Sequence, residues 1–528
     1  MKTLSSLSLL ACAGLALGTV VALPGAAATA AAARYEAEAA PAVCDGAVET
    51  EHAGYSGTGF CNATNALGAA LQFTVNAAQA GTATLSVRFA NGTTTARPAN
   101  ATVNGAAAGS PSFEGTGTWT AWTTKTLTVP VVQGANIVRF SPTTANGLPN
   151  IDYLEAETGG TTTPPPSGSA LYVAPGGTDG AAGTVSSPTT LTSAISRVTS
   201  GGTIYLRGGR YGQAVTVTVP AGQDGTSAAR TTLAAYPGET PVLDFSAQTQ
   251  SASNRGLQLN ASYWHIRGIV VERAGDNGIY VGGSHNVVER TVTRFNRDTG
   301  LQLGRIASTT PSSAWPSDNL ILSAESHDNA DSDGEDADGF AAKLTTGTGN
   351  VFRYTVSHHN IDDGWDLYTK PDTGPIGPVT IEDSLSYANG TLSDGSQAGA
   401  GDRNGYKLGG EDIGVNHIVR RSIAYRNGKH GFTYNSNPGS MAVSNNVSID
   451  NSERNFNFDA GTSVFRGNTS CRSGSGTNDR IVGDSDASNQ FWSGSDGSRC
   501  SSYSGALGWS FASDGRLVVT FGGTQVTP

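Results

Sequence analysis

The chain has 528 residues, with 43 Asp and Glu against 32 Lys and Arg, which gives a net charge of −11. Only 14% of the residues are charged, and Gly, Ala, Ser, Thr and Asn are common. An acidic chain of this kind lacks the basic face that nucleic acid requires. Beyond the first 33 residues, no stretch is apolar enough to span a membrane. We therefore expect no nucleic-acid or membrane partner, and we expect a monomer.

Residues 1–33 have the pattern of a secretory signal peptide: Lys2 supplies a positive charge, residues 7–23 are largely apolar, and an Ala-rich run offers cleavage sites. The sequence therefore predicts a secreted, extracellular protein that loses Cys12 on processing. Four cysteines remain and fall into two local pairs. In an oxidising compartment we expect two disulfides, Cys44 with Cys61 and Cys471 with Cys500.

Residues 34–157 alternate strand-like segments, such as 70–75 and 83–89, with turns, and they lack helical periodicity. Many short strands at regular spacing predict a small β-sandwich. Residues 158–169 read Thr-Gly-Gly-Thr-Thr-Thr-Pro-Pro-Pro-Ser-Gly-Ser. This segment has no large apolar residue and is typical of a linker.

Four elements of residues 34–157 together resemble family 35 carbohydrate-binding modules and, more loosely, family 6: segments 35–38, 54–60, 117–122 and 150–157. The resemblance implies a structural calcium site and sugar-binding loops. An aromatic ring suits the apolar face of a sugar, and an amide suits its hydroxyls. The implied calcium ligands are Glu36, Glu38 and Asp152, and the implied sugar-binding residues are Tyr55, Trp119 and Asn150. Because Trp119 and Trp122 lie three apart in a strand-like stretch, we expect one inside and one outside.

Residues 170–528 begin with a strand-like segment, and residues 187–198 then predict a short amphipathic helix that covers the first coil of a repeat region. Eight later segments share one pattern, a Gly or Asn, a large apolar residue, a variable residue and another apolar residue. They begin 22 to 41 residues apart, at Gly256, Gly278, Gly300, Gly339, Gly364, Gly405, Gly431 and Asn455. Repeats of this length with short β segments predict a stacked solenoid.

A second register supports the repeat, because an asparagine ends each of six strand-like segments. These residues are Asn296, Asn329, Asn360, Asn389, Asn427 and Asn451. Stacked amides can bond to one another and to turn backbone. We therefore assign these asparagines to structure.

The repeat aligns charged residues that are distant in sequence. Side chains alternate along a strand, so the second residue after the Gly points outward, which places Asp366 and Lys407 on successive coils. The residue before the Gly is Asp338 on one coil and Asp363 on the next, beside Asp362. Stacked strands lie roughly 4.8 Å apart. The sequence therefore predicts one patch of four acids and a lysine, flanked by loops inserted at 307–317 and 390–402.

Four clustered carboxylates repel one another unless some are protonated or a hard cation binds. An all-oxygen set suits Ca²⁺ better than zinc or copper. Lys407 could be a surface charge, an ion-pair partner of the acids, or a general base.

Segments 326–343, 360–368 and 404–410 closely resemble, in this order, polysaccharide lyase family 9, the pectate lyases on a right-handed parallel β-helix. The resemblance covers about 170–470. It implies an all-β chain with a right-handed parallel β-helix over 170–528, preceded by the β-sandwich. It also implies Ca²⁺ held by Asp338, Asp362, Asp363 and Asp366, with Lys407 as the general base. The implied reaction is β-elimination on pectate (polygalacturonate), an acidic plant cell-wall polysaccharide. Lys343, Arg403 and Tyr434 are weaker candidates for binding further carboxylates.

Three alternatives remain open at this point. A polygalacturonase-type β-helical hydrolase also needs several aspartates, but as acid and base for water attack. A lyase could act on another uronic acid polymer, such as alginate or a rhamnogalacturonan. A non-catalytic β-helix could bind polysaccharide. Residues after about 470 carry no motif that separates these alternatives.

Overall fold

The computed structural model describes residues 33–77, 81–131, 134–158, 170–397, 399–512 and 514–527. The chain divides into two compact units, Met1–Thr163 and Pro164–Pro528. Residues 1–32 of the expected signal peptide and 159–169 of the expected linker lie outside the described residues. In the described part of the chain, no helix is long and apolar enough to cross a membrane.

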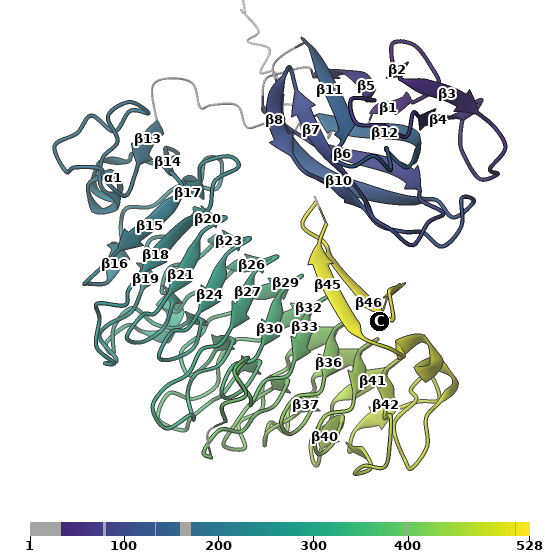
Figure 1. Cartoon of the computed structure of the whole chain (residues 1–528). Helices are drawn as coiled ribbons and strands as arrows, with labels where there is room; N and C mark the ends of the chain where they lie inside the picture. Colours follow the sequence, from purple (N-terminus) through teal and green to yellow (C-terminus); the bar gives the residue numbers. More distant parts are fainter. Residues whose placement is uncertain are drawn as a thin grey trace, which may run out of the picture. The chain divides into compact units, whose positions relative to one another are not determined.

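The first unit is a sandwich of two antiparallel sheets (Figure 1). One sheet contains β1 (Ala33–Glu36), β3 (Gly46–Glu49), β4 (Phe60–Ala63), β6 (Gly81–Ala90), β10 (Thr123–Val131) and β12 (Asn150–Thr158). The other contains β2 (Val43–Cys44), β5 (Leu71–Ala77), β7 (Arg97–Val103), β8 (Ala106–Gly109), β9 (Ser112–Phe113) and β11 (Gly134–Pro142). Alternate residues of β5, Leu71, Phe73 and Val75, are fully buried, as expected for a strand with one face in the core. The predicted β-sandwich is confirmed, and Cys44 is bonded to Cys61.

The second unit is a parallel β-helix whose strands form three long sheets (Figure 1). Sheet 1 contains β13 (Ala170–Val173), β14 (Thr203–Leu206), β17 (Thr231–Ala235), β20 (Trp264–Arg267), β23 (Val287–Glu289), β26 (Leu320–Leu322), β29 (Val351–Arg353), β32 (Thr380–Glu382), β35 (Ile418–Arg420), β38 (Ala442–Ser444), β41 (Val464–Arg466) and β44 (Asp484–Ser485). Sheet 2 contains β15 (Gly209–Gly212), β18 (Pro241–Asp244), β21 (Val270–Glu272), β24 (Val292–Arg294), β27 (Glu325–His327), β30 (Val356–His358), β33 (Leu385–Tyr387), β36 (Ile423–Tyr425), β39 (Val447–Ile449) and β42 (Thr469–Cys471). Sheet 3 contains β16 (Val217–Val219), β19 (Leu257–Leu259), β22 (Ile279–Val281), β25 (Leu301–Leu303), β28 (Phe340–Ala342), β31 (Trp365–Asp366), β34 (Tyr406–Lys407), β37 (Phe432–Thr433), β40 (Phe456–Phe458) and β43 (Arg480–Ile481).

Sheet 3 contains all eight repeat segments, paired in the predicted register. Leu257 lies beside Ile279, for example, and Asp366 lies beside Lys407. The first apolar residue of each segment points into the coil, where neighbouring rings stack with centroids 4.5 to 5.1 Å apart. The stacked residues are Phe340, Trp365, Tyr406, Phe432 and Phe456. The predicted solenoid is therefore confirmed coil by coil.

The six predicted asparagines form a buried hydrogen-bonded ladder. Each side-chain amide donates to the next asparagine's Oδ1 over 2.8 to 3.0 Å, from Asn296 to Asn451. A shorter ladder, Asn286 to Asn319 to Asn350, precedes strands of sheet 1 and was not predicted from the sequence. Both ladders satisfy backbone groups at the corners of the coils, where a buried unpaired group would destabilise the fold.

The helix that covers the first coil, α1 (Leu191–Arg197), is shorter than the predicted 187–198. Thr189 pairs in parallel with Val173 of β13, so the start of the predicted helix extends a sheet instead. Thr190 then caps the helix by accepting a hydrogen bond from the Ser193 N–H. Leu191, Ala194 and Ile195 are buried in the core at this end of the solenoid.

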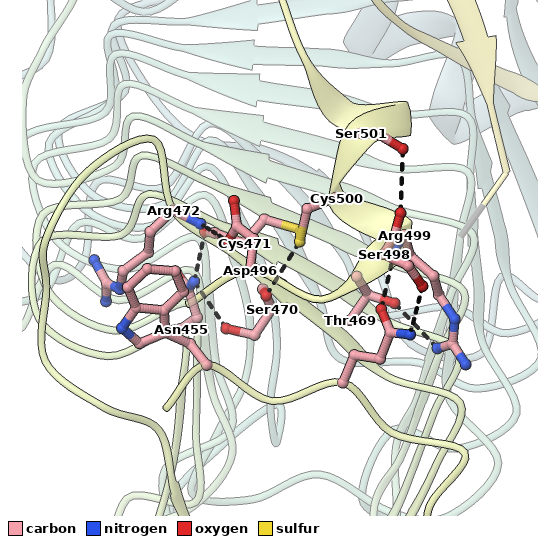
Figure 2. Close-up of a disulfide and its surroundings, with 12 residues drawn as sticks. Asn455, Thr469, Ser470, Cys471, Arg472, Asp496, Ser498, Arg499, Cys500 and Ser501 are labelled. Atoms are coloured by element: carbon pink, nitrogen blue, oxygen red, sulfur yellow. Dashed lines mark hydrogen bonds between the residues drawn. A yellow bond between two sulfur atoms is a disulfide. The ribbon is translucent and has the colours of Figure 1, made fainter. Parts of the chain in front are cut away.

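Residues after 470 continue the coils through β43 and β44 and then leave the solenoid. They form the 3-10 helix η2 (Ser498–Tyr503) and the antiparallel strands β45 (Leu507–Phe511), β46 (Leu517–Phe521) and β47 (Thr524–Val526). Val519 and Phe521 pack with Val356, Leu385 and Ile423 of sheet 2. The disulfide between Cys471 of β42 and Cys500 of η2 fastens this segment (Figure 2).

Candidate active site

The four predicted acids meet at sheet 3. Asp338 and Asp363 precede β28 and β31, Asp362 lies in the same turn as Asp363, and Asp366 ends β31. Their exposed fractions are 0%, 0%, 1% and 3% in that order. Oxygen atoms of Asp338, Asp362 and Asp363 all lie within 4.8 Å of one another. The fold thus brings together the oxygens of residues up to 25 positions apart in sequence. Asp366 lies beside them, with its Oδ2 3.3 Å from Lys343 Nζ and 3.8 Å from Lys407 Nζ.

Hydrogen bonds fix one oxygen of most of these carboxylates. Asp338 Oδ2 accepts from Thr299 Oγ1 at 3.0 Å. Asp363 Oδ1 accepts from the Asn404 side chain at 3.0 Å and from its backbone N–H at 2.5 Å. Asp362 Oδ1 accepts from the backbone N–H groups of Asp402 and Arg403.

Two buried oxygens, Asp363 Oδ2 and Asp366 Oδ1, have no hydrogen-bond partner among the described residues. Burial raises the pKa of Asp363 to about 6, and it raises the pKa of Asp338 and Asp362 well above their usual range. A buried carboxylate with an oxygen that accepts no hydrogen bond is stabilised either by a proton or by a bound cation. The donors are oxygens only, so the site fits a hard cation such as Ca²⁺.

Two lysines enter the cluster from different coils. Lys407 Nζ lies 3.3 Å from Asp363 Oδ2 and 3.8 Å from Asp366 Oδ2. Lys343 Nζ lies 2.8 Å from Asp338 Oδ2 and 3.3 Å from Asp366 Oδ2. Burial lowers the pKa of Lys407, but the carboxylates, Asp366 first, outweigh burial and raise the pKa above its usual range.

Asp402 is a residue of this site that the sequence did not single out. Its carboxylate lies 3.0 Å from Lys407 Nζ and 3.1 Å from Lys429 Nζ. It ends the loop inserted at 390–402, and a repeat pattern cannot place residues of an insertion. The only sign of its role in the sequence is that it lies two residues before Asn404, the start of segment 404–410.

A cleft of about 270 Å³ opens onto the cluster. Its lining includes Glu335, Asp336, Lys343, Leu344, Asp366, Tyr368, Lys370, Ala400, Asp402 and Lys407. Lys343 therefore borders the cleft, although its ammonium group is already engaged by two carboxylates.

The structure places the other two candidates for carboxylate binding outside this lining. Tyr434 is the third residue after Gly431, an inward position, and it packs against the core of the coil. Arg403 lies close to Gly390 and Gly428, where added Cβ atoms would lie 2.5 and 2.9 Å from its Cβ. A repeat pattern assigns a strand position, but it does not show where a long side chain from a turn will lie.

In the first unit, the three candidate calcium ligands converge on segment 56–58. Ser56 donates to Asp152 and Glu36 over 2.9 and 3.0 Å, and the Thr58 N–H donates to Glu38 at 2.9 Å. Burial raises the pKa of Glu36, and the carboxylates of Glu38 and Asp152 add to that rise. Glu38 Oε2 is buried without a hydrogen-bond partner among the described residues. Arg88 forms an ion pair with Asp152, so part of this charge is already balanced.

Two of the three candidate sugar-binding residues lie around one aromatic group. Tyr55 lies 5.7 Å from the Phe60 ring, and Trp119 stacks on His52 at 5.8 Å, measured between ring centroids. Asn150 is 3% exposed at the start of β12. The expectation of one buried and one exposed tryptophan is wrong, because Trp119 and Trp122 are both half-buried. The stretch that carries them is a turn and not a strand, so side chains do not alternate there.

Comparisons with known proteins agree with both units. Residues 171–470 match the family described as "Pel9A-like, right handed beta helix region", and residues 38–158 match the carbohydrate-binding module family 6. A protein named Pectate lyase L from Paenibacillus polymyxa is 52% identical over 61% of this chain and 72% of that relative. The crystal structure of pectate lyase Pel9A superposes on this chain with a TM-score of 0.57 and 31% sequence identity. The match covers 68% of this chain and 88% of the Pel9A chain. A family 35 module, the CBM35 from Cellvibrio japonicus Abf62, is 43% identical over 24% of this chain and 92% of that chain, with a TM-score of 0.23. The chain therefore belongs to the Pel9A-like, right-handed β-helix family of polysaccharide lyases, with a carbohydrate-binding module as its first unit.

Proposed function

We propose that this chain is a secreted, calcium-dependent pectate lyase that cleaves polygalacturonate by β-elimination. One observation carries the proposal: Lys407 Nζ lies in the cleft, 3.3 Å from a buried carboxylate oxygen that accepts no hydrogen bond from any described residue. A basic group is thus held directly beside an oxygen cluster suited to a cation. The name of the Paenibacillus relative supports pectate as the substrate.

The proposed cation ligands are Asp338, Asp362, Asp363 and Asp366. When bound there, Ca²⁺ would neutralise a substrate uronate and acidify the C5–H beside it. Asp363 Oδ2 and Asp366 Oδ1 accept no hydrogen bond from a described residue, so they are the oxygens we expect to bind it. Asn404 holds the other oxygen of Asp363, so that carboxylate is already oriented.

Lys407 is the proposed base. Its neutral Nζ takes the proton from C5, the C5–H electron pair forms the C4–C5 double bond, and the C4–O bond breaks with its electrons on the leaving oxygen. That oxygen then takes a proton. The surrounding carboxylates favour the charged form of Lys407. We therefore expect activity to rise toward alkaline pH, since only the neutral amine can accept the proton.

The first unit is proposed to keep the enzyme near its polymer, which raises the local substrate concentration. Glu36, Glu38 and Asp152 would hold its structural cation, and Tyr55 and Trp119 are its proposed sugar contacts. Asn150 remains a third candidate contact, although the residue is only 3% exposed.

The experiment that tests the proposal follows ultraviolet absorbance while the protein acts on polygalacturonate at alkaline pH, with Ca²⁺ or with a chelator. A calcium-dependent rise reports the new C4–C5 double bond and supports the proposal. New reducing ends without absorbance would make the chain a hydrolase. A rise on alginate or rhamnogalacturonan alone would keep the chemistry and change the substrate.

A further inference from the structure

Two residues of the cleft have no part in the chemistry proposed above. Tyr368 and Lys370 follow β31 directly and line the cleft together with Lys407. Tyr368 is half-buried and Lys370 is exposed. Both are therefore within reach of a polymer that occupies the cleft.

Residues 410–412 hold the ring of Tyr368 in place. Its hydroxyl donates a hydrogen bond of 2.5 Å to Glu411 Oε1. A Cβ atom on Gly410 would lie 2.2 Å from the Cδ2 and Cε2 atoms of the ring, so only glycine allows this approach. Glu411 and Asp412 have φ angles of 55° and 57°, a left-handed conformation that costs free energy for residues other than glycine. The turn that contacts the ring therefore has a strained backbone, and it fixes the position of Tyr368.

Two ammonium groups lie near this ring. Lys407 Nζ is 5.3 Å from the ring centroid and Lys370 Nζ is 5.9 Å from it. Carboxylates of the site engage Lys407. Lys370, by contrast, forms no ion pair with any described residue within 4.0 Å. The cleft therefore offers a fixed aromatic ring and an unpaired cation side by side, beside the proposed base.

We propose that Tyr368 and Lys370 form a subsite for the uronate unit adjacent to the one that reacts. The Tyr368 ring packs against the C–H face of that sugar, and Lys370 pairs with its carboxylate. A uronic acid unit presents both features, an apolar ring face and a charge on one edge. This inference rests on the proposed function, because it takes the reacting unit to lie beside Lys407.

The subsite has a consequence for substrate choice. A methyl ester on the adjacent unit removes the charge that Lys370 binds, while the sugar face that Tyr368 contacts is unchanged. Lys370 therefore discriminates against partly esterified polymer, and Tyr368 does not.

The test compares Lys370→Met, Lys370→Arg and Tyr368→Leu on short oligogalacturonates, with calcium present. Lys370→Met should raise KM about tenfold with kcat within about twofold, since a hydrogen bond to a charged group is lost. Lys370→Arg should restore most of that loss, and Tyr368→Leu should raise KM about fivefold through the lost ring contact. Lys125→Met, in the first unit, is the matched control for removing a lysine charge and should leave KM unchanged.

A second measurement separates this inference from the function on which it rests. Calorimetric titration with trigalacturonate on a Lys407→Ala background, which lacks the proposed base, reports binding alone. Equal affinities with and without the added Lys370→Met substitution would overturn the subsite even if the wild type makes unsaturated product. Weakened binding by Lys370→Met would support the subsite even if no unsaturated product were found, in which case the proposed function fails separately. Thermal melting checks that each variant is folded.

Discussion

Lys407 has two possible roles at the site, because it is both the proposed base and an ion-pair partner of Asp363. Arginine separates the two roles, since it keeps the charge but does not lose a proton in proteins. We predict that Lys407→Ala and Lys407→Arg both lower kcat by about 10²- to 10⁴-fold, the usual contribution of a general base. Initial rates of absorbance increase on polygalacturonate measure this. If Lys407→Arg remains active, Lys407 is not the base and serves only as an ion-pair partner of the carboxylates.

Lys343 differs from Lys370, although both line the cleft. The Lys343 ammonium lies 2.8 Å from Asp338 Oδ2, and Asp338 is fully buried. Removing one partner of a buried pair leaves an uncompensated charge. We therefore predict that Lys343→Met lowers the free energy of unfolding by about 3 kcal/mol in calcium-free buffer.

Lys370→Met is the control for this prediction, because Lys370 is exposed and its loss should change the free energy of unfolding by about 0.5 kcal/mol or less. Denaturant unfolding in the presence of a chelator measures both. If the two variants are equally stable, Lys343 is no structural counter-charge, and a role in substrate binding is favoured instead.

At the scale of the element, the corners of the coils depend on buried side chains that accept backbone hydrogen bonds. Asn319 Oδ1 accepts from the Asn286 N–H at 2.8 Å just before a strand of sheet 1. His417, before β35, has the same role: its Nδ1 accepts from the Val379 N–H at 3.1 Å. Burial lowers the pKa of His417 to about 3. A proton on Nδ1 would also oppose the Val379 N–H directly.

The pH dependence of stability follows from that pKa. Between pH 6.5 and about 3 the unfolded chain protonates this histidine and the folded chain does not, so acidification favours unfolding. The group contributes a slope of about 1.4 kcal/mol per pH unit in this window. We predict that His417→Asn, which keeps an acceptor of the kind used at Asn319, removes this slope. Unfolding free energies of both proteins at several pH values test it, and parallel curves would contradict it.

The sequence predicted best those elements that repeat. Each of the eight repeat segments in sheet 3 is in its expected register, and Asp366 lies beside Lys407 as predicted, because strand alternation and stacking are set by local pattern. Asp402, Tyr368 and Lys370 were missed, since their positions depend on inserted loops and on turns after the strand. The start of α1 was misplaced because pairing of Thr189 with Val173 overrode helical periodicity.

At the scale of the whole molecule, each unit has its own core and its own disulfide. The solenoid has a further requirement, because the apolar outer face of sheet 2 from β30 to β42 must be covered. Strands β45 to β47 cover it, and Trp509 Nε1 donates to the Tyr387 hydroxyl at 3.1 Å. The carboxylate cluster belongs to sheet 3. Strands β45 to β47, which we call the cover, therefore pack on a different sheet from the one that bears the proposed catalytic residues.

This separation predicts that the cover can be weakened without loss of catalysis. Phe521 is 2% exposed within the cluster that joins β46 to sheet 2. Phe521→Ala should lower the free energy of unfolding by about 3 kcal/mol or more, because a buried ring is removed and a cavity remains. It should leave kcat and KM on polygalacturonate unchanged below the unfolding transition, since the cleft lining and the cluster that holds the cover share no residue.

Val482→Ala is the matched control, because Val482 also lies after residue 470 but is 36% exposed. Its free energy of unfolding should change by about 0.5 kcal/mol or less. Denaturant unfolding and initial rates on the same preparations decide the outcome. A Phe521→Ala protein with wild-type stability would show that the last strands rest on the solenoid without supporting it. A fall in kcat in a folded Phe521→Ala protein would show instead that packing beneath the cover affects the position of the carboxylates through the coils.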